Sequence, residues 1–168
     1  SAWILAGHSM GATVSLLAAR MRPDRVAGLV LLDPPMLPFD VAREVRAGAI
    51  IPNPMADQAA RRRGMFPSRA EARAAYHGRG VFTTWSDADL DAYLAGGLLE
   101  TDEGVELACA PAFESATFRA VSPNVEPALG AVRCPFVLLA GEHGSTVRDV
   151  ELAARLAGLV DGDLLETL

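Results

Sequence analysis

Ser9 is the residue of this chain whose type and surroundings best suit covalent chemistry. It lies in Gly7-His8-Ser9-Met10-Gly11, a Gly-x-Ser-x-Gly pattern. The apolar run 2–6 before it predicts a strand, and residues 10–21 after it predict a helix. A serine between a strand and a helix lies on a sharp turn that presents its hydroxyl as a nucleophile, and the two flanking glycines leave room for the elements to approach closely.

The chemistry that this turn suits is acyl transfer. A serine hydroxyl is a poor nucleophile by itself, so it needs a histidine as a base. The predicted helix directs its positive end at the site. We therefore expect the backbone N–H of Met10 to donate a hydrogen bond to the oxyanion of a tetrahedral intermediate.

Residues 1–19 resemble the nucleophile elbow of the α/β-hydrolase superfamily. Residues 22–34 and 132–142 resemble the helix end and the two strands that follow it in that family. The resemblance implies an α/β fold, in which this chain supplies the parallel strands five to eight of the sheet, with flanking helices and an inserted helical cap.

The resemblance also implies a division of the chain. We expect residues 1–35 and 131–168 to belong to the core and residues 36–130 to form the cap. One helix is predicted to run through Arg46 with Asp40 as its cap. A second is predicted to follow the capping-box pattern Ser68-Arg69-Ala70-Glu71 toward Tyr76, and a third to follow Ser86 as its cap. No strong strand signal is found in this middle segment.

In the core, strands are predicted at 26–32 and 136–140, and a helix at 149–159. In the helix at 10–21, Leu16, Leu17 and Met21 are expected to share one face.

The family places its nucleophile after the fifth strand and its histidine beyond the last strand. Here Ser9 lies near the N-terminus, and residues 164–168 look like the beginning of that last strand. We therefore expect the chain to be truncated at both ends and inactive by itself, with the catalytic histidine absent from it and located after Leu168. The strand ending at Ala6 would then expose an unpaired edge, so the isolated chain is expected to aggregate.

The acid of the triad has two candidates. The family usually has Gly-x-x-Asp after the seventh strand, whereas this chain has Gly141-Glu142-His143-Gly144, with glycine in place of the aspartate. Asp33, in Leu32-Asp33-Pro34, resembles the acid that certain lipases hold after the sixth strand; its structural alternative is a turn former. Glu142 lies near the usual position and is otherwise a surface carboxylate.

The chain has three histidines, and none occupies the position that the family gives to the base. His8 adjoins the nucleophile, but the elbow directs its side chain away from Ser9. His77 is expected to be solvated. His143 follows the strand at 136–140, in a loop that normally supplies the acid.

The composition of the chain limits the classes of molecule that it is expected to bind. The net charge is −6, all 15 basic residues are arginine, and lysine is absent, which argues against nucleic acid and excludes a P-loop or Schiff-base lysine in this segment. No apolar run is long enough to span a bilayer. Cys109 and Cys134 form no disulfide framework, and a reducing cytoplasm fits them. No metal or organic cofactor is implied, and the expected partner is a small-molecule substrate.

These observations predict a serine hydrolase that acts on a small or medium carboxylic ester. Serine rather than aspartate at the nucleophile position counts against the epoxide hydrolase and haloalkane dehalogenase branches. A carbon–carbon bond hydrolase, a thioesterase, a cofactor-free lyase and a non-catalytic hydrolase-like binding protein remain alternatives. Phe66, Phe82, Trp85 and Tyr93 either line an acyl pocket or form the core of the cap.

Overall fold

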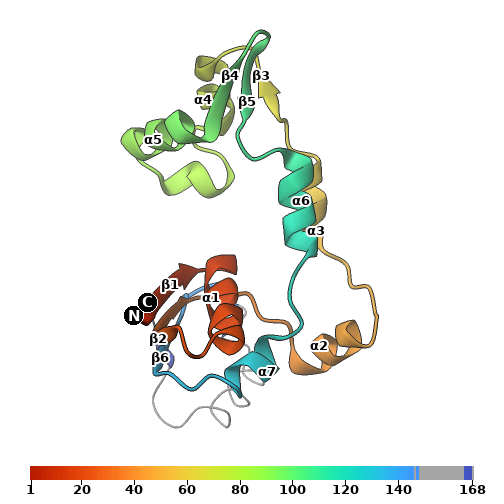
Figure 1. Cartoon of the computed structure of the whole chain (residues 1–168). Coiled ribbons are helices and arrows are strands. Elements are labelled where there is room, and N and C mark those ends of the chain that lie inside the picture. Colours follow the sequence, from red (N-terminus) through yellow and green to blue (C-terminus); the bar gives the residue numbers. More distant parts are fainter. Residues whose placement is uncertain (146, 148–164, 168) are drawn as a thin grey trace. The chain divides into compact units, whose positions relative to one another are not determined.

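The computed structural model divides the chain into two compact units. Ser1–Ile51 and Ser122–Leu168 belong to the first unit, and Pro52–Val121 form the second (Figure 1). The structure describes residues 1–145, 147 and 165–167. The predicted core and cap boundaries stay predictions.

The first unit is built on a four-stranded sheet in the order β1-β2-β6-β7, and every pairing is parallel. Its strands are β1 (Trp3–His8), β2 (Val26–Leu32), β6 (Phe136–Ala140) and β7 (Leu165–Thr167). Helix α1 (Met10–Met21) connects β1 to β2. The apolar run of β2 reflects its place between two neighbours, as expected of a buried parallel strand. The fold is therefore the predicted partial α/β fold.

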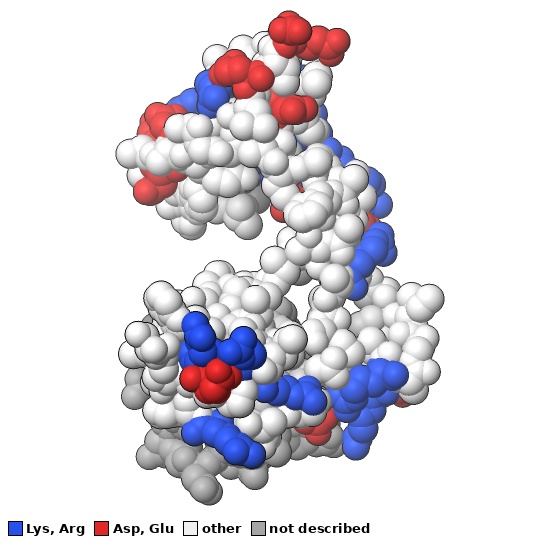
Figure 2. Space-filling view, in the orientation of Figure 1, with Lys and Arg blue, Asp and Glu red and all other residues white. Residues whose placement is uncertain are grey.

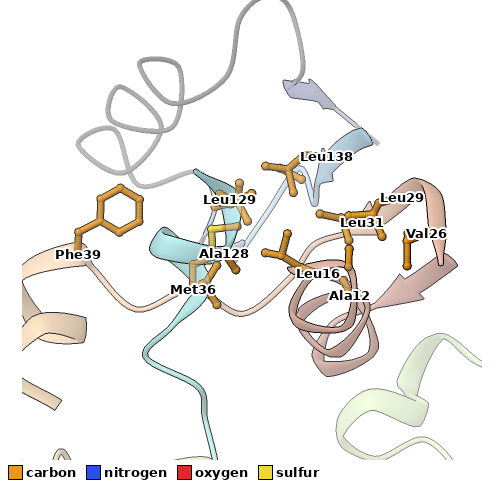
Figure 3. Close-up of a cluster of buried hydrophobic side chains, with 14 residues drawn as sticks. Ala12, Leu16, Val26, Leu29, Leu31, Met36, Phe39, Ala128, Leu129 and Leu138 are labelled. Carbon is orange, nitrogen blue, oxygen red and sulfur yellow. The ribbon is translucent and has the colours of Figure 1, made fainter. Parts of the chain in front are cut away.

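The core of the first unit lies between the sheet and its helices (Figure 3). Leu16 of α1 packs there with Leu31 and Leu138 of the sheet, and all three side chains are almost fully buried. Burying each contributes roughly 2 kcal/mol. Met36 and Leu129 also belong to this core. These two residues fall within the predicted 36–130 insertion but pack with the first unit.

Met21 does not share the buried face of α1, so this expectation was wrong. Its side chain is 78% exposed, whereas Ala12, Leu16 and Ala19 are buried. Met21 follows Leu16 by five positions, which places the two side chains about 140° apart around the helix.

Two short helices complete the described part of the first unit: α2 (Phe39–Arg46) and α7 (Val125–Leu129). The predicted helix through Arg46 is confirmed, but Asp40 is not its cap. The helix begins at Phe39, with Pro38 in the capping position, because the buried Phe39 ring is anchored in the core. The predicted helix at 149–159 lies outside the described residues.

The second unit contains helices and a small sheet. Its elements are α3 (Pro54–Ala60), β3 (Met65–Phe66), α4 (Arg69–Tyr76), the 3₁₀ helix η1 (Gly80–Thr84), α5 (Asp87–Gly97), β4 (Leu98–Thr101), β5 (Gly104–Leu107) and α6 (Pro111–Arg119). The strands are antiparallel in the order β3-β5-β4, so the expectation of a segment without strands was wrong.

The turn between β4 and β5 depends on Gly104, and the burial pattern of β5 alternates. Gly104 follows the turn between β4 and β5 with a φ of +132°, and a Cβ at this position would lie 2.3 Å from the carbonyl oxygen of Phe66. Only glycine can adopt this φ and avoid this clash without strain. Val105 and Leu107 are buried while Glu106 is exposed, which is the alternation of a half-buried strand.

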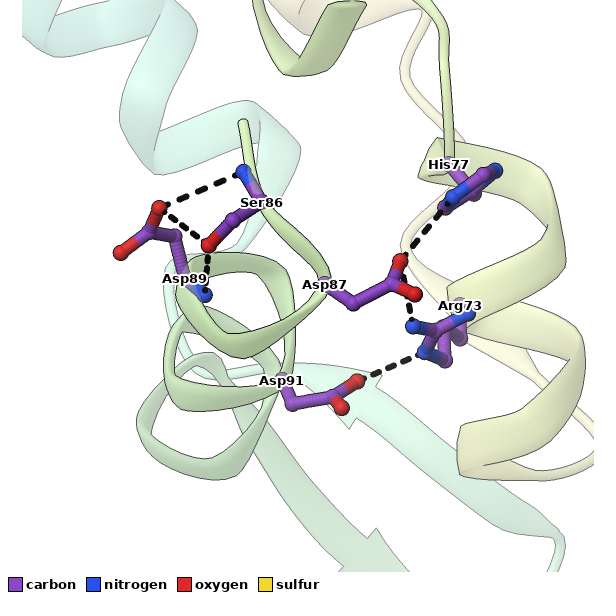
Figure 4. Close-up of polar contacts among 6 residues, drawn as sticks. All are labelled: Arg73, His77, Ser86, Asp87, Asp89 and Asp91. Atoms are coloured by element: carbon purple, nitrogen blue, oxygen red, sulfur yellow. Dashed lines mark hydrogen bonds and ion pairs between the residues drawn. The ribbon is translucent and has the colours of Figure 1, made fainter. Parts of the chain in front are cut away.

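Hydrogen bonds and ion pairs hold α4 and α5 together (Figure 4). Arg73 contacts Asp91 at 2.6 Å and Asp87 at 2.8 Å, and His77 lies 3.1 Å from the same Asp87 oxygen. His77 is exposed, as expected. Ser86 caps α5 through a capping box with Asp89. Ser68 caps α4 by accepting the N–H of Glu71, so Ser68 and Ser86 are both confirmed as caps. The return bond from the Ser68 N–H to the Glu71 side chain, which a capping box requires, is not among the hydrogen bonds of the described residues.

Charged side chains of both signs lie on the visible face of each unit (Figure 2). Within the described residues, the helices are all too short or too polar to cross a bilayer.

Candidate active site

Ser9 lies at the junction of β1 and α1 in a strained backbone conformation. Its φ of 53° and ψ of −124° fall where residues other than glycine are rare. Its N–H donates to the carbonyl of Leu32 at 2.8 Å, which ties the turn to the end of β2. The residue is exposed, and its hydroxyl has no hydrogen-bond partner among the described residues. The predicted sharp turn is therefore present, and Ser9 is exposed on it.

Gly7 permits this turn. A Cβ at Gly7 would lie 2.3 Å from the carbonyl carbon of Gly11 and 2.6 Å from the nitrogen of Ala12, both in the backbone of α1. Gly11 differs, because a Cβ there would meet no described atom within 4 Å. Within the described part of the chain, the close approach of strand and helix thus requires Gly7 alone.

The N–H of Met10 is positioned as a free donor. Met10 is the first residue of α1, and no described residue accepts a hydrogen bond from its N–H. The N–H groups of Ala12 and Thr13 instead donate to the Ser9 carbonyl. Unpaired N–H groups at the beginning of a helix carry its partial positive charge and attract anions.

Asp33 follows β2 at the same edge of the sheet as Ser9. Its N–H donates to the carbonyl of Leu139 at 2.7 Å, and its φ is +44°, so it too is strained. His8 pairs with Leu32 in the β1–β2 register. Ser9 and Asp33 are consequently the next residues of two neighbouring parallel strands.

The loop after β6 contacts the Asp33 carboxylate. The hydroxyl of Ser145 donates a hydrogen bond to Oδ1 of Asp33, and the N–H of Val147 donates to the Ser145 hydroxyl at 3.1 Å. A Cβ on Gly141 would approach Oδ2 of Asp33 to 3.3 Å. This loop thus holds one oxygen of the carboxylate by the hydrogen bond from Ser145 and passes close to the other oxygen at Gly141. The sequence did not point to Ser145, because its neighbours form no recognisable motif with it.

The other candidates after β6 are less constrained. Glu142 and His143 are both exposed, and neither side chain has a polar partner among the described residues. Gly144, where the family pattern has aspartate, has a φ of +71°. That conformation suits glycine, so the loop geometry accounts for the residue found there.

His8 and the two cysteines give no sign of a second reactive site among the described residues. His8 is exposed, and no described side chain contacts it through a hydrogen bond. Cys134 packs against the core and Cys109 is exposed; both are free thiols. The described residues contain no cluster of three or more metal-ligating side chains.

The model of the Alpha/beta hydrolase family matches residues 2–166 of this sequence. The chain belongs to this family. A comparison with curated proteins finds no match.

Solved structures similar to this chain include E-2-(acetamidomethylene)succinate hydrolase, at 22% identity and a TM-score of 0.64 over 98% of this chain and 57% of that one. The peroxisomal alpha-beta-hydrolase Lpx1 of Saccharomyces cerevisiae has 15% identity and a TM-score of 0.73, covering 98% of this chain and 45% of that one. An esterase of M. tuberculosis has 17% identity and a TM-score of 0.66, with 98% and 54% covered. At these identities the likeness concerns the fold, and the chain spans about half the length of each structure.

Proposed function

We propose that this α/β hydrolase is part of a serine hydrolase that cleaves carboxylic esters, with Ser9 as the nucleophile. The observation that carries the proposal is the strained, exposed Ser9, whose hydroxyl is unpaired among the described residues at the beginning of α1. Strain of this kind persists where function needs it. The second unit, in this proposal, serves as the cap.

Each residue has a role in the proposed reaction. Ser9 Oγ attacks the ester carbonyl carbon while a histidine from outside residues 1–168 takes its proton. The N–H of Met10 donates to the oxyanion that forms. The tetrahedral intermediate expels the alcohol, which receives the proton from the histidine. Water then attacks the acyl-enzyme, and the acid and free Ser9 are released.

Asp33 is the proposed acid, and Glu142 is the alternative. An acid in a triad holds the imidazole in one tautomer and stabilises its cation, so its carboxylate must be held in place. The hydrogen bond from Ser145 supports Asp33 in this role. The exposed Glu142 has no comparable support among the described residues.

Hydrolysis of p-nitrophenyl esters by the full-length protein tests the proposal. Ser9→Ala should lower kcat by about 10⁴-fold or more. Ser15→Ala is the matched control, because Ser15 lies within α1, which Ser9 precedes, and its hydroxyl donates to the Gly11 carbonyl at 2.8 Å. A Ser9→Ala variant with normal ester hydrolysis would contradict the proposal. Activity on thioesters or carbon–carbon bonds, but not on esters, would favour those alternatives.

A further inference from the structure

The second unit contains a pocket of about 530 Å³ that its own residues form. This volume lies within the range of sites that bind small molecules. Helices α3, α4, α5 and α6 contribute to its walls, together with the segment at η1. The pocket therefore belongs to Pro52–Val121 alone.

An aromatic cluster forms one wall. The rings of Tyr76, Phe82, Trp85 and Tyr93 all line the pocket. Phe82 has its ring centroid 5.0 Å from those of Tyr76 and Trp85, and 5.2 Å from that of Tyr93. Such tilted and edge-on arrangements are the favourable ones, so the wall is rigid and apolar. Phe66, by contrast, is buried in the core of the second unit and does not line the pocket.

The pair of Arg62 and Glu114 forms another part of the pocket lining. Nη1 of Arg62 lies 2.8 and 2.6 Å from the two carboxylate oxygens of Glu114, and Nη2 donates to the Tyr76 hydroxyl at 3.4 Å. Partial burial lowers the pKa of Arg62, but the bonds to Tyr76 and Tyr93 and the pairing with Glu114 outweigh it, and the pKa is raised. Arg62 and Glu114 thus neutralise each other and leave no free charge.

Arg79 is the remaining charged residue of the wall. Its guanidinium has no ion pair or hydrogen bond with the residues that the structure describes, all of Pro52–Val121 included. The pocket therefore combines aromatic faces with one uncompensated positive charge. A ligand that fits has an apolar body and a single negative group, since a guanidinium suits a carboxylate.

We propose that the pocket of the second unit binds an apolar monocarboxylate, with its hydrocarbon part against Phe82, Trp85 and Tyr93 and its carboxylate on Arg79. The inference rests on the contacts within the second unit and does not depend on the proposed esterase function. The ligand is either a free carboxylic acid or the acid end of a larger molecule.

The fluorescence of Trp85 measures ligand binding to the pocket. The chain has two tryptophans, and the other, Trp3, lies in the first unit, so Trp3→Phe leaves Trp85 as the single reporter. The full chain with this change is titrated with 3-phenylpropionate and with its neutral analogue 3-phenylpropionamide. We expect saturable change in Trp85 fluorescence, with the carboxylate binding at least about tenfold more tightly than the amide. Acetate, which lacks the apolar body, should give no saturation.

Substitutions of arginine test whether Arg79 supplies the positive charge that binds the carboxylate. Arg79→Gln should bring the carboxylate to within about twofold of the amide, and Arg79→Lys should restore part of the difference. Arg61→Gln is the matched control, since Arg61 is exposed and lies outside the pocket lining. Circular dichroism establishes that each variant is folded. Equal affinities for carboxylate and amide in the parent chain, or an unchanged preference in Arg79→Gln, would overturn the proposal.

Discussion

The hydroxyl of Ser145 donates a hydrogen bond to Oδ1 of Asp33, although the two residues are 112 positions apart in the sequence. This bond connects the loop after β6 to the end of β2, beside the strand that leads to Ser9. Because Ser145 also accepts the N–H of Val147, its hydroxyl has a fixed direction. The carboxylate of Asp33 is therefore held at the sheet edge where Ser9 lies.

Substitutions at the two candidate acids distinguish them. In the full-length protein, Asp33→Asn should lower kcat for ester hydrolysis by about 10⁴-fold, because an amide cannot stabilise the histidine cation or hold its tautomer. Glu142→Gln should leave kcat within about twofold, as expected of an exposed loop carboxylate. Steady-state kinetics measure both. A large loss in Glu142→Gln with normal Asp33→Asn would reverse the assignment.

We expect Ser145 to act by positioning the carboxylate of Asp33. Ser145→Ala should reduce kcat by about tenfold while KM changes little, because Asp33 keeps its charge but loses the bond that directs it. Ser145→Thr, which retains the hydroxyl, should recover part of the activity. If both variants are equally impaired, or neither is, the hydrogen bond is not what matters at this position.

Gly7 should be intolerant of any side chain. Gly7→Ala places a Cβ within 2.3 Å of the α1 backbone, so the helix must move away from β1. We expect the free energy of unfolding to fall by about 2–3 kcal/mol in urea titrations of the full chain. Gly11→Ala, where space is open, should be neutral or stabilising by up to about 1 kcal/mol, because alanine favours a helix over glycine. Equal effects of the two changes would argue against the close approach.

Ser86 should contribute to the stability of α5. Its hydroxyl accepts the N–H of Asp89 at 3.2 Å, and the Asp89 carboxylate accepts the Ser86 N–H at 3.3 Å (Figure 4). Ser86→Ala should cost about 1 kcal/mol, and Ser86→Asn should restore most of it. Hydrogen exchange in the first turn of α5 measures the local effect. Unchanged exchange in Ser86→Ala would show that the cap is dispensable.

Asp87 should make the stability of the second unit depend on pH. Its hydrogen bond and ion pair with Arg73 lower the pKa of Asp87 below the usual value of about 3.9. The stabilisation is then complete above the unfolded pKa, and it is lost as pH falls through the lower folded pKa. The Tm of Asp87→Asn should lie slightly below that of the parent at pH 7 and converge with it in strong acid.

Asp102→Asn, in the exposed turn between β4 and β5, serves as the control for this experiment. Its melting temperature should follow that of the parent over the same pH range. A constant difference between Asp87→Asn and the parent at every pH would show that the pairing with Arg73 does not contribute.

The parts of this molecule that depend on neighbouring residues were predictable from its sequence. The elbow at Ser9 follows from glycines and a strand–helix boundary within one short segment, and β2 follows from an unbroken apolar run. The caps at Ser68 and Ser86 follow from residues three positions apart. Local patterns of this kind determine the backbone geometry without help from distant residues.

What escaped prediction depends on distant contacts. The pairing of β3 with β5 joins residues about 40 positions apart, and only Gly104 and a brief alternation mark it in the sequence. Ser145 became significant only when the sheet brought its loop beside Asp33. The start of α2 at Phe39 was likewise set by burial in the core and not by the capping preference of Asp40.

Covalent labelling of the full-length protein with a fluorophosphonate tests the central claim most directly. The reagent phosphonylates a serine that an adjacent base has activated, and peptide mass spectrometry identifies the residue. We predict a single modification on Ser9, absent from Ser9→Ala and unchanged in Ser15→Ala. A folded protein that hydrolyses esters without label at Ser9, or with the label on another serine, would contradict the assignment of the nucleophile.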